Sequence, residues 1–229
     1  MNVTFLKWGA GSLALLVSAA GVTTVFAQDP SSSQSSPSAA TPAATTPAAG
    51  TEKKTDPSIA QRKENQQDRI ANGVKSGQLT GGETANLEKK ESAINKETAA
   101  DRAANGGKLT SAEKAQVNKQ QNQVSKQIYA DKHNANTAHY GNNKVGQRRE
   151  NQQDRIAQGI KSGQLTPSET AKLEKQQQGI NKQVASDRKA NGGTLNATQK
   201  KQINKEQNQA SRNIYHKKHN AATQGSAKP

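Results

Sequence analysis

The sequence has no cysteine and few aromatic residues, and both shortages exclude classes of protein. Without cysteine among its 229 residues, the chain forms no disulfide, no thiolate metal site and no cysteine nucleophile. Aromatic residues make up 3% of the chain and hydrophobic residues 30%, well below the usual apolar share of a globular domain. Any core must therefore be thin, and packing alone must hold it together.

Acidic residues are scarce as well. The chain has 18 Asp and Glu against 33 Lys and Arg, which gives a formal net charge of +15. Such an excess predicts attraction to anionic surfaces such as nucleic acid, acidic polysaccharide or lipid headgroups. A solvated basic surface without a partner is the alternative interpretation.

Residues 1–27 have the pattern of a secretory signal peptide. Lys7 supplies the positive start, residues 9–26 are uncharged and largely apolar, and Val25-Phe26-Ala27 fits a cleavage site before Gln28. An uncleaved membrane anchor is the competing interpretation, because the apolar stretch is just long enough to span a bilayer. We expect cleavage, no transmembrane segment in the mature chain, and a periplasmic or secreted protein.

Residues 28–57 consist mainly of Ser, Thr, Pro and Ala, with almost no large apolar side chain. Such a segment buries too little surface to offset the entropy of ordering it, so it is predicted to be a disordered tether. It is either a spacer that holds the folded part away from a membrane or wall, or a simple linker.

The remainder of the chain is an internal duplication. Residues 61–136 align without gaps to residues 147–222 at an offset of 86, and 48 of the 76 aligned positions are identical. We therefore expect two helical repeat domains, at 58–136 and 147–222. Residues 137–146 form the linker between them, and 223–229 a disordered tail.

Four short segments with a common pattern punctuate the two copies, at 76–83, 106–113, 162–169 and 192–199. In these joints a glycine permits a turn at positive φ, and a leucine points inward. Thr-x-x-Glu then forms a capping box for the next helix, with Asn and Gln replacing Thr and Glu in the fourth joint. The residues assigned to this structural role are Gly77, Leu79, Thr80, Glu83, Gly107, Leu109, Thr110, Glu113, Gly163, Leu165, Thr166, Glu169, Gly193, Leu195 and Asn196.

Between the joints, apolar residues recur at helical spacing. In the first copy they predict helices over about 58–75, 81–104 and 111–132, and the second copy repeats the pattern. The expected fold class is all-α: two tandem copies of a three-helix, EF-hand-like domain built from helix-loop-helix pairs, after a disordered N-terminal segment.

The EF-hand comparison comes from the joints, because Gly-x-Leu-Thr-x-x-Glu resembles the second half of an EF-hand calcium loop. The resemblance implies that Glu83, Glu113 and Glu169 occupy the last, bidentate ligand position, and Glu83 and Glu169 are the candidate metal ligands among them. Acidic donors are missing at the earlier positions, where the first joint has Asn72, Val74 and Ser76. The capping box explains the same glutamates without a metal. Calcium-free helix-loop-helix geometry is thus expected, and these glutamates are kept as candidate ligands.

Near the C-terminus, His216 and His219 lie three residues apart and have the spacing to contact one divalent metal. Together with the two glutamates they support the alternative function, a weak divalent-metal binder or sensor. The structural interpretation is a basic last helical turn that complements the helix dipole, with Tyr129 and Tyr215 closing the core. No cofactor is expected.

The segment from Arg69 to Glu83, repeated from Arg155 to Glu169, reads Arg-Ile-x-x-Gly-x-x-Ser-Gly-x-Leu-Thr-x-x-Glu. In this respect the chain resembles uncharacterised exported bacterial proteins built from tandem units of this pattern. The resemblance implies a location in the envelope or outside the cell and implies no activity.

The first helix of each copy opens with a strongly polar run that lacks an apolar stripe. Either this run projects into solvent, or Arg62, Arg69, Arg148 and Arg155 bind an anionic partner there. Sequence-specific nucleic-acid recognition is disfavoured, because no groove-reading motif and no stacking aromatic residue lies on the basic faces.

Catalysis is not expected. No nucleophile or phosphate-loop motif is present, and the carboxylates alternate with lysines on faces predicted to be exposed. The function that these patterns favour is an exported, non-enzymatic binding or scaffolding protein of the cell envelope, which engages an anionic polymer or envelope component through basic helix faces.

Overall fold

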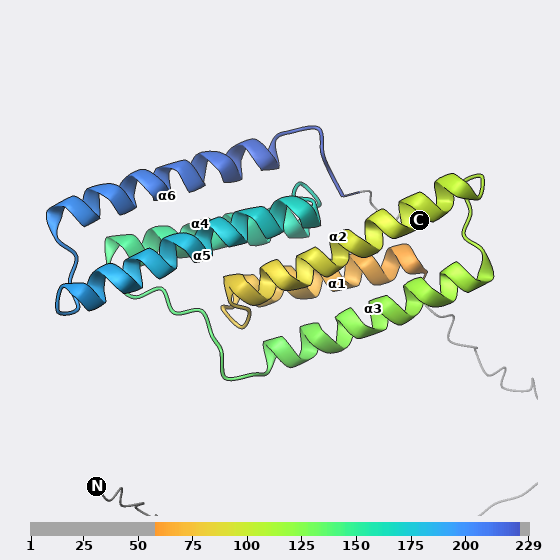
Figure 1. Cartoon of the computed structure of the whole chain (residues 1–229), viewed down its shortest axis with the longest axis horizontal. Helices are drawn as coiled ribbons and strands as arrows, with labels where there is room; N and C mark the ends of the chain where they lie inside the picture. The colour runs from red at the N-terminus through yellow and green to blue at the C-terminus, as the bar shows by residue number, and fades with distance from the viewer. Residues whose placement is uncertain (1–57, 225–229) are drawn as a thin grey trace, which may run out of the picture. The chain divides into compact units, whose positions relative to one another are not determined.

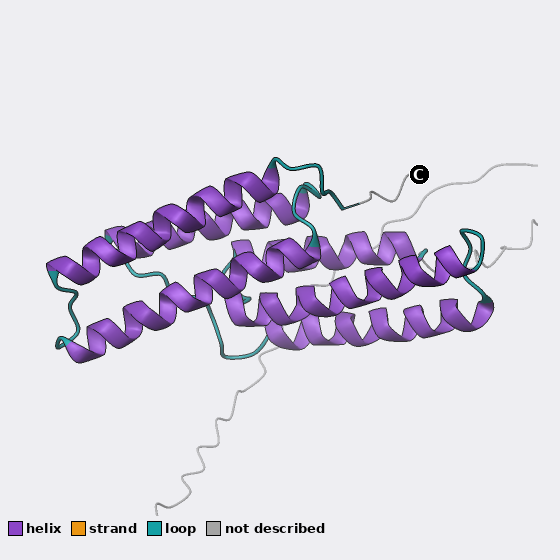
Figure 2. Cartoon of the chain, turned by 45° about the horizontal axis from the view of Figure 1, so that its top comes forward, coloured by secondary structure: helices purple, strands orange, loops and turns teal. Residues whose placement is uncertain are grey.

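The computed structural model describes residues 58–224, and the predicted signal peptide and tether lie outside the described residues, as does the tail from 225 onward. Within the described part the chain is helical and contains no strand (Figures 1 and 2). The all-α class is thus confirmed. The helices are α1 (Ile59–Lys75), α2 (Gly81–Ala104), α3 (Ser111–Lys132), α4 (Lys144–Lys161), α5 (Pro167–Ala190) and α6 (Ala197–Lys218).

The helix boundaries follow from local sequence signals. The predicted bounds of the first three helices agree with the observed ones to within one residue, because each helix begins directly after a capping residue. Helices α5 and α6 begin and end 86 residues after α2 and α3. Below, α1 to α3 are called the N-terminal half and α4 to α6 the C-terminal half.

Glycines close the joints after α1 and α4. Gly77 and Gly163 have φ of 71° and 70°, a conformation that costs other residues energy. The carbonyl oxygen of each also accepts a hydrogen bond from the segment that follows the third helix of its half, from Ala138 N and Gln224 N, both at 2.8 Å. Each of these joints therefore also anchors the end of its own half.

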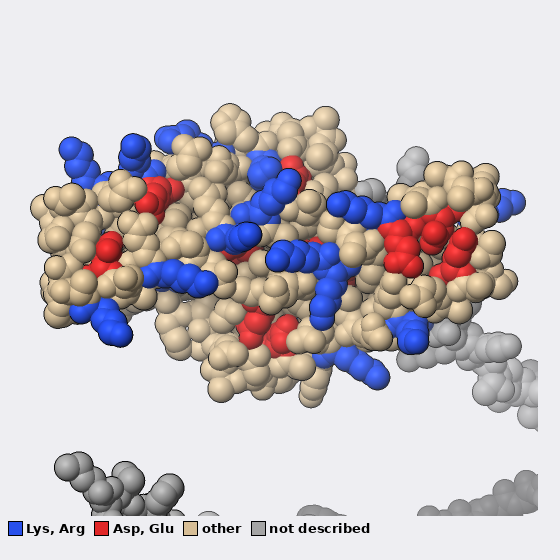
Figure 3. Space-filling model, viewed as in Figure 1, with Lys and Arg blue, Asp and Glu red and all other residues tan. Residues whose placement is uncertain are grey.

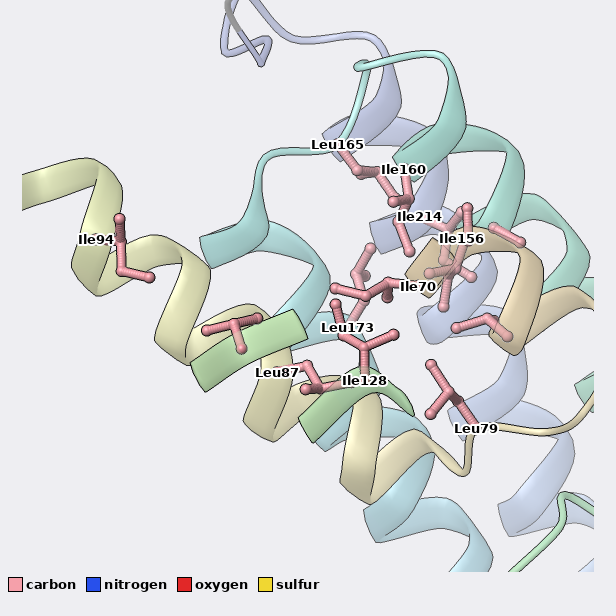
Figure 4. Close-up of a cluster of buried hydrophobic side chains, with 14 of the residues drawn as sticks. Ile70, Leu79, Leu87, Ile94, Ile128, Ile156, Ile160, Leu165, Leu173 and Ile214 are labelled. Atoms are coloured by element: carbon pink, nitrogen blue, oxygen red, sulfur yellow. The ribbon is translucent and has the colours of Figure 1, made fainter. Parts of the chain in front are cut away.

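The two halves share a core. Helix α2 packs along α5, and α1 along α4, so the most extensive helix contacts run between the halves. One buried cluster accordingly combines side chains from both halves, as Figure 4 shows around Ile70, Leu87, Ile156 and Leu173. All six helices belong to one compact unit.

A second, smaller apolar cluster lies within the C-terminal half. It joins Ile180 and Val184 of α5 to Ile203 and Ala210 of α6, with Leu195 of the joint between them. The end of this half is therefore stabilised by its own packing, away from the shared core.

The strongly polar run of the first helix is exposed at Gln61, Glu64 and Asn65, but it does not project into solvent along its whole length. Gln66 is 2% exposed, and its Nε2 donates to the carbonyl oxygen of Gln121 in α3 at 2.6 Å. Gln152 makes the corresponding bond to Gln207 in α6 at 2.7 Å. Glutamine thus takes core positions here, because its amide can bond the backbone of a neighbouring helix.

Membrane-spanning helices are absent from the described part of the chain: none of its helices combines the length and the apolar character needed to cross a bilayer.

Candidate functional site

The joint glutamates act as helix caps. In the first joint, Glu83 N donates to Thr80 Oγ1 at 3.3 Å, while Glu83 Oε2 accepts from Thr80 N at 2.9 Å and from Thr80 Oγ1 at 2.7 Å. The same reciprocal box pairs Thr110 with Glu113, Thr166 with Glu169, and Asn196 with Gln199. The carboxylates thus satisfy backbone donors at the helix starts.

The second carboxylate oxygen of the candidate metal ligands is occupied as well. Glu83 Oε1 accepts from Asn134 Nδ2 at 2.8 Å, and Glu169 Oε1 accepts from Asn220 Nδ2 at 2.6 Å. Partial burial favours a higher pKa for both carboxyl groups, but these hydrogen bonds and those from the capping threonines lower the pKa below its ordinary value. Donor hydrogens therefore fill the positions that a cation needs.

The histidine pair lies at the end of α6. The ring of His219 stacks on Tyr215 with centroids 4.2 Å apart, and its Nδ1 donates to the Tyr215 carbonyl oxygen at 2.7 Å. His216 meets the same tyrosine edge-on at 5.9 Å. Within residues 58–224, no three histidine or carboxylate side chains are grouped so as to hold a metal ion.

The tyrosines do not close the core, and that prediction is wrong. Tyr129 is 62% exposed and Tyr215 is 55% exposed. Tyr129 stacks on His133 in the arrangement seen for Tyr215 and His219, with centroids 4.2 Å apart. The core positions one residue earlier are filled by Ile128 and Ile214, which leaves each tyrosine on the outer face of its helix.

The capping assignment gives a direct test. We expect Glu83→Gln to lower the free energy of unfolding by about 1 kcal/mol, because a neutral amide accepts the Thr80 backbone hydrogen bond less strongly. The loss should be the same in excess calcium and in chelator, as measured by urea unfolding. Calcium-dependent stabilisation of the unmodified chain, absent from the variant, would contradict the assignment and favour a calcium site.

The arginines assigned to partner binding lie between helices. Arg62 Nη1 donates to Asn122 Oδ1 at 3.0 Å, and Arg69 Nη2 donates to the Ser125 carbonyl oxygen at 3.1 Å. Both line a cavity of about 530 Å³. These contacts join α1 to α3.

The second half repeats the arrangement between α4 and α6. Arg148 Nη1 donates to Asn204 Oδ1 at 3.3 Å, and Arg155 Nη2 donates to the Ser211 carbonyl oxygen at 3.2 Å. The four arginines are half-buried. Their guanidinium groups therefore contribute to helix packing as well as to the charge of the surface.

Three glutamates are fully buried, contrary to the prediction that the carboxylates lie on exposed faces. Glu88, Glu91 and Glu174 have 0% exposure. Glu88 Oε2 accepts from Gln67 Nε2 at 3.2 Å, and Glu174 Oε2 accepts from Gln153 Nε2 at 2.9 Å.

Burial shifts the ionisation of these glutamates. Loss of hydration raises the pKa of Glu88 to about 8 and that of Glu91 and Glu174 to about 7. The neighbouring charge of Lys63 opposes the shift for Glu91 and Glu88 without cancelling it. These groups can hold and release protons near neutral pH, but they are closed to a substrate.

A basic groove crosses the surface of the C-terminal half. It consists of a cavity of about 700 Å³ and a second cavity of about 600 Å³, whose linings share Asn204. The charged residues of the two linings are all cationic, and they are Lys144, Arg188, Lys200, Lys201, Lys205 and Arg212. Figure 3 shows basic side chains along the edge where α6 runs in Figure 1. The floor includes Val145 and Leu195.

The groove is more basic than the corresponding surface of the N-terminal half, where two of its six cations are replaced by neutral residues. At the equivalent positions of the N-terminal half, 86 residues earlier, Lys144 becomes Ser58 and Lys201 becomes Ala115. Gln199, beside Lys200, becomes the acidic Glu113. This difference in charge is visible in the sequence when the two aligned copies are compared position by position.

The geometry therefore provides a cationic groove, two exposed tyrosine–histidine stacks and a closed set of buried carboxylates. The chain matches no protein-family model, no curated protein and no solved structure.

Proposed function

We propose that this chain is an exported, non-enzymatic binding protein of the cell envelope, which engages an anionic polymer through the basic groove of its C-terminal half. The observation that carries the proposal is the lining of that groove, which contains six cations and no carboxylate among the described residues. Clustered charge of one sign raises the local concentration of an oppositely charged ligand and accelerates its association.

The groove combines two kinds of cation. Arg188 and Arg212 offer planar groups suited to paired bonds with carboxylate, sulfate or phosphate, whereas the lysines act as mobile point charges. Because they project from helices that pack on the core, their backbones are held in place. Such a site recognises the charge density of a polymer.

The composition of the groove supports binding without chemistry. Its lining contains amides, hydroxyls and cations, with no histidine or carboxylate in general acid–base position. The buried glutamates, which do have perturbed pKa values, are fully enclosed between helices.

The finer architecture belongs to the same proposal: two tandem copies of a three-helix unit with EF-hand-like helix-loop-helix pairs, in which the capping box replaces the calcium ligands. The equal lengths of α2 and α5, and of α3 and α6, support it. Duplication would let one copy become the more basic while both maintain the core.

The test compares equivalent positions in the two halves. The groove variant carries Lys200→Gln, Lys205→Gln and Arg212→Gln, and the control carries Lys114→Gln, Lys119→Gln and Lys126→Gln. We expect the groove variant to lose affinity for polyphosphate by more than tenfold, at about 1 kcal/mol per contact. The control should lose less affinity than the groove variant, because in the N-terminal half Ser58 and Ala115 stand in place of two of the groove cations and Glu113 lies beside Lys114.

Fluorescence anisotropy of labelled polyphosphate across a salt series measures both effects. Affinity should fall steeply as salt rises, and the slope should be shallower for the groove variant. Equal losses in the two variants, or no binding by the unmodified chain at low salt, would refute the proposal.

A further inference from the structure

One exposed face of α6 carries three of the six groove cations and continues past them to a tyrosine. The members of this face are spaced alternately by four and three residues, and they are Lys201, Lys205, Asn208, Arg212, Tyr215 and His219. That spacing puts them on one side of a helix, and all are exposed. At the rise of an α-helix the face extends for about 27 Å.

Helix α3 has a shorter version of the same face. Its members, 86 residues earlier, are Lys119, Asn122, Lys126, Tyr129 and His133, and all are exposed. Each half thus presents cations and an amide in a line that ends in a tyrosine–histidine stack.

The stacks are held in a fixed geometry. In each stack the rings are close to parallel, at 28° for Tyr129 on His133 and 27° for Tyr215 on His219. The histidine Nδ1 donates to the carbonyl oxygen of the same tyrosine at 2.7 Å in both. A ring that is already fixed loses little entropy when a ligand stacks on it.

Exposure is unusual for these side chains. Tyr129 and Tyr215 are the only large hydrophobic residues exposed in residues 58–224, and they occupy equivalent positions. Capping of the helix end requires the histidine contact to the carbonyl, but it does not require an uncovered phenol ring. The free faces of the rings thus have no structural role within the described chain.

Building on the proposed function, we propose that the polymer is an acidic polysaccharide, with sugar rings stacking on Tyr129 and Tyr215. The electron-rich face of a phenol ring attracts the C–H groups on one face of a sugar ring. The acidic groups of the polymer pair with Lys205 and Arg212. Its hydroxyls can accept from the side-chain amide nitrogen of Asn208, whose Oδ1 already accepts from Arg148.

A single nucleic-acid strand fits this face less well. Such strands are held by several aromatic side chains on which successive bases stack. The face of α6 offers one tyrosine, already stacked on His219 at the end of the face, and its other positions are cations and an amide. Alternation of charge with amide, and one ring at the end, suits a polymer with acidic groups and many hydroxyls.

Having such a face in each half allows one chain to make two contacts with a repetitive polymer. A second contact on the same polymer becomes intramolecular, and the combined affinity then exceeds that of either face.

The experiment compares three polymers at one ionic strength. They are polygalacturonate, which has sugar rings and carboxylates; poly-glutamate, which has carboxylates on a peptide backbone and no rings; and oligo-deoxythymidylate. We expect the full chain to bind polygalacturonate about tenfold more tightly than poly-glutamate. Tyr129→Ala with Tyr215→Ala should remove this preference, and the paired Tyr→Phe variant should retain it, because the ring is preserved. Thermal unfolding should be unchanged in both variants, since the rings are exposed.

The outcomes separate the two proposals. Salt-dependent binding of all three polymers with equal affinity, unchanged in the alanine variant, would overturn the polysaccharide assignment and leave the proposed function standing. Tightest binding of the oligonucleotide, lost in the alanine variant, would assign the stacks to nucleic acid instead. Binding of none of the three would overturn both proposals together.

Discussion

The free energy of unfolding is expected to fall as the pH rises from about 5 to about 8, because buried carboxyl groups must then ionise. In the folded chain the pKa is raised to about 8 for Glu88 and about 7 for Glu91 and Glu174, against an ordinary value of 4.5. A raised pKa means that the folded state binds protons more tightly than the unfolded state. The stabilisation is therefore complete below pH 4.5 and is lost as the pH passes through the folded values.

The expected change in the free energy of unfolding is large for a protein with so thin a core. A carboxyl group whose pKa rises from 4.5 to about 7 on folding adds on the order of 3 kcal/mol to the free energy of unfolding at acidic pH, and this stabilisation is lost at alkaline pH. Such a loss is a large fraction of the stability of a typical domain. Urea unfolding curves recorded at intervals between pH 5 and 9 would show the midpoint moving to lower urea on the alkaline side.

Glu91→Gln provides the sharpest variant for this prediction. At the equivalent position of the C-terminal half, Gln177 donates from Nε2 to Gln152 Oε1 at 3.1 Å. Both carboxylate oxygens of Glu91 are buried without a hydrogen-bond partner. Gln66 Oε1, which corresponds to the acceptor Gln152 Oε1, is also buried without a partner. The amide should supply the missing donor, stabilise the fold at pH 8 and flatten the pH dependence. A variant less stable at pH 8, or an unchanged slope, would contradict it.

Leu79→Ala and Leu165→Ala are each expected to destabilise the fold by about 2–5 kcal/mol. Leu79 is 1% exposed, Leu165 is 0% exposed, and both belong to the cluster shared by the halves (Figure 4). Each also packs against the backbone of the preceding helix, because a Cβ added at Gly73 of α1 or Gly159 of α4 would lie 2.6 Å from the leucine Cδ1. Truncation thus leaves a cavity that rigid helix backbone cannot fill.

The matched control is Leu109→Ala. The sequence pattern treats the leucines of all four joints alike, yet Leu109 is 8% exposed and lies outside both apolar clusters. Its truncation should cost clearly less than that of Leu79, as measured by urea unfolding. Equal losses at the two positions would show that burial in the shared cluster does not determine the cost.

Local signals made the helices predictable. A capping threonine or asparagine and a turn glycine act within a few residues, so the joints could be placed from the sequence alone. The buried glutamates could not, because Glu88 and Glu174 are enclosed by contacts between α2 and α5, which no local pattern specifies. Polar residues at core-facing positions of α2, such as Thr84 beside Leu87, were the available sign.

The candidate site likewise combines features that the local sequence predicts with features that depend on how the helices pack. An excess of cations was evident from composition, but their gathering in one groove depends on how α4, α5 and α6 meet. The four-residue spacing from each tyrosine to a histidine is visible in the sequence, but the exposure of the tyrosines depends on which face of α3 and α6 packs inward. Isoleucine at the preceding position takes that face in both helices.

Because α1 packs on α4 and α2 on α5, the molecule is equivalent to a dimer whose two subunits are joined by a covalent linker. The segment from 133 to 143 keeps the two partners at an effective concentration on the order of millimolar. Dilution therefore cannot separate them, whereas two unlinked chains with the same contacts would come apart as their concentration fell.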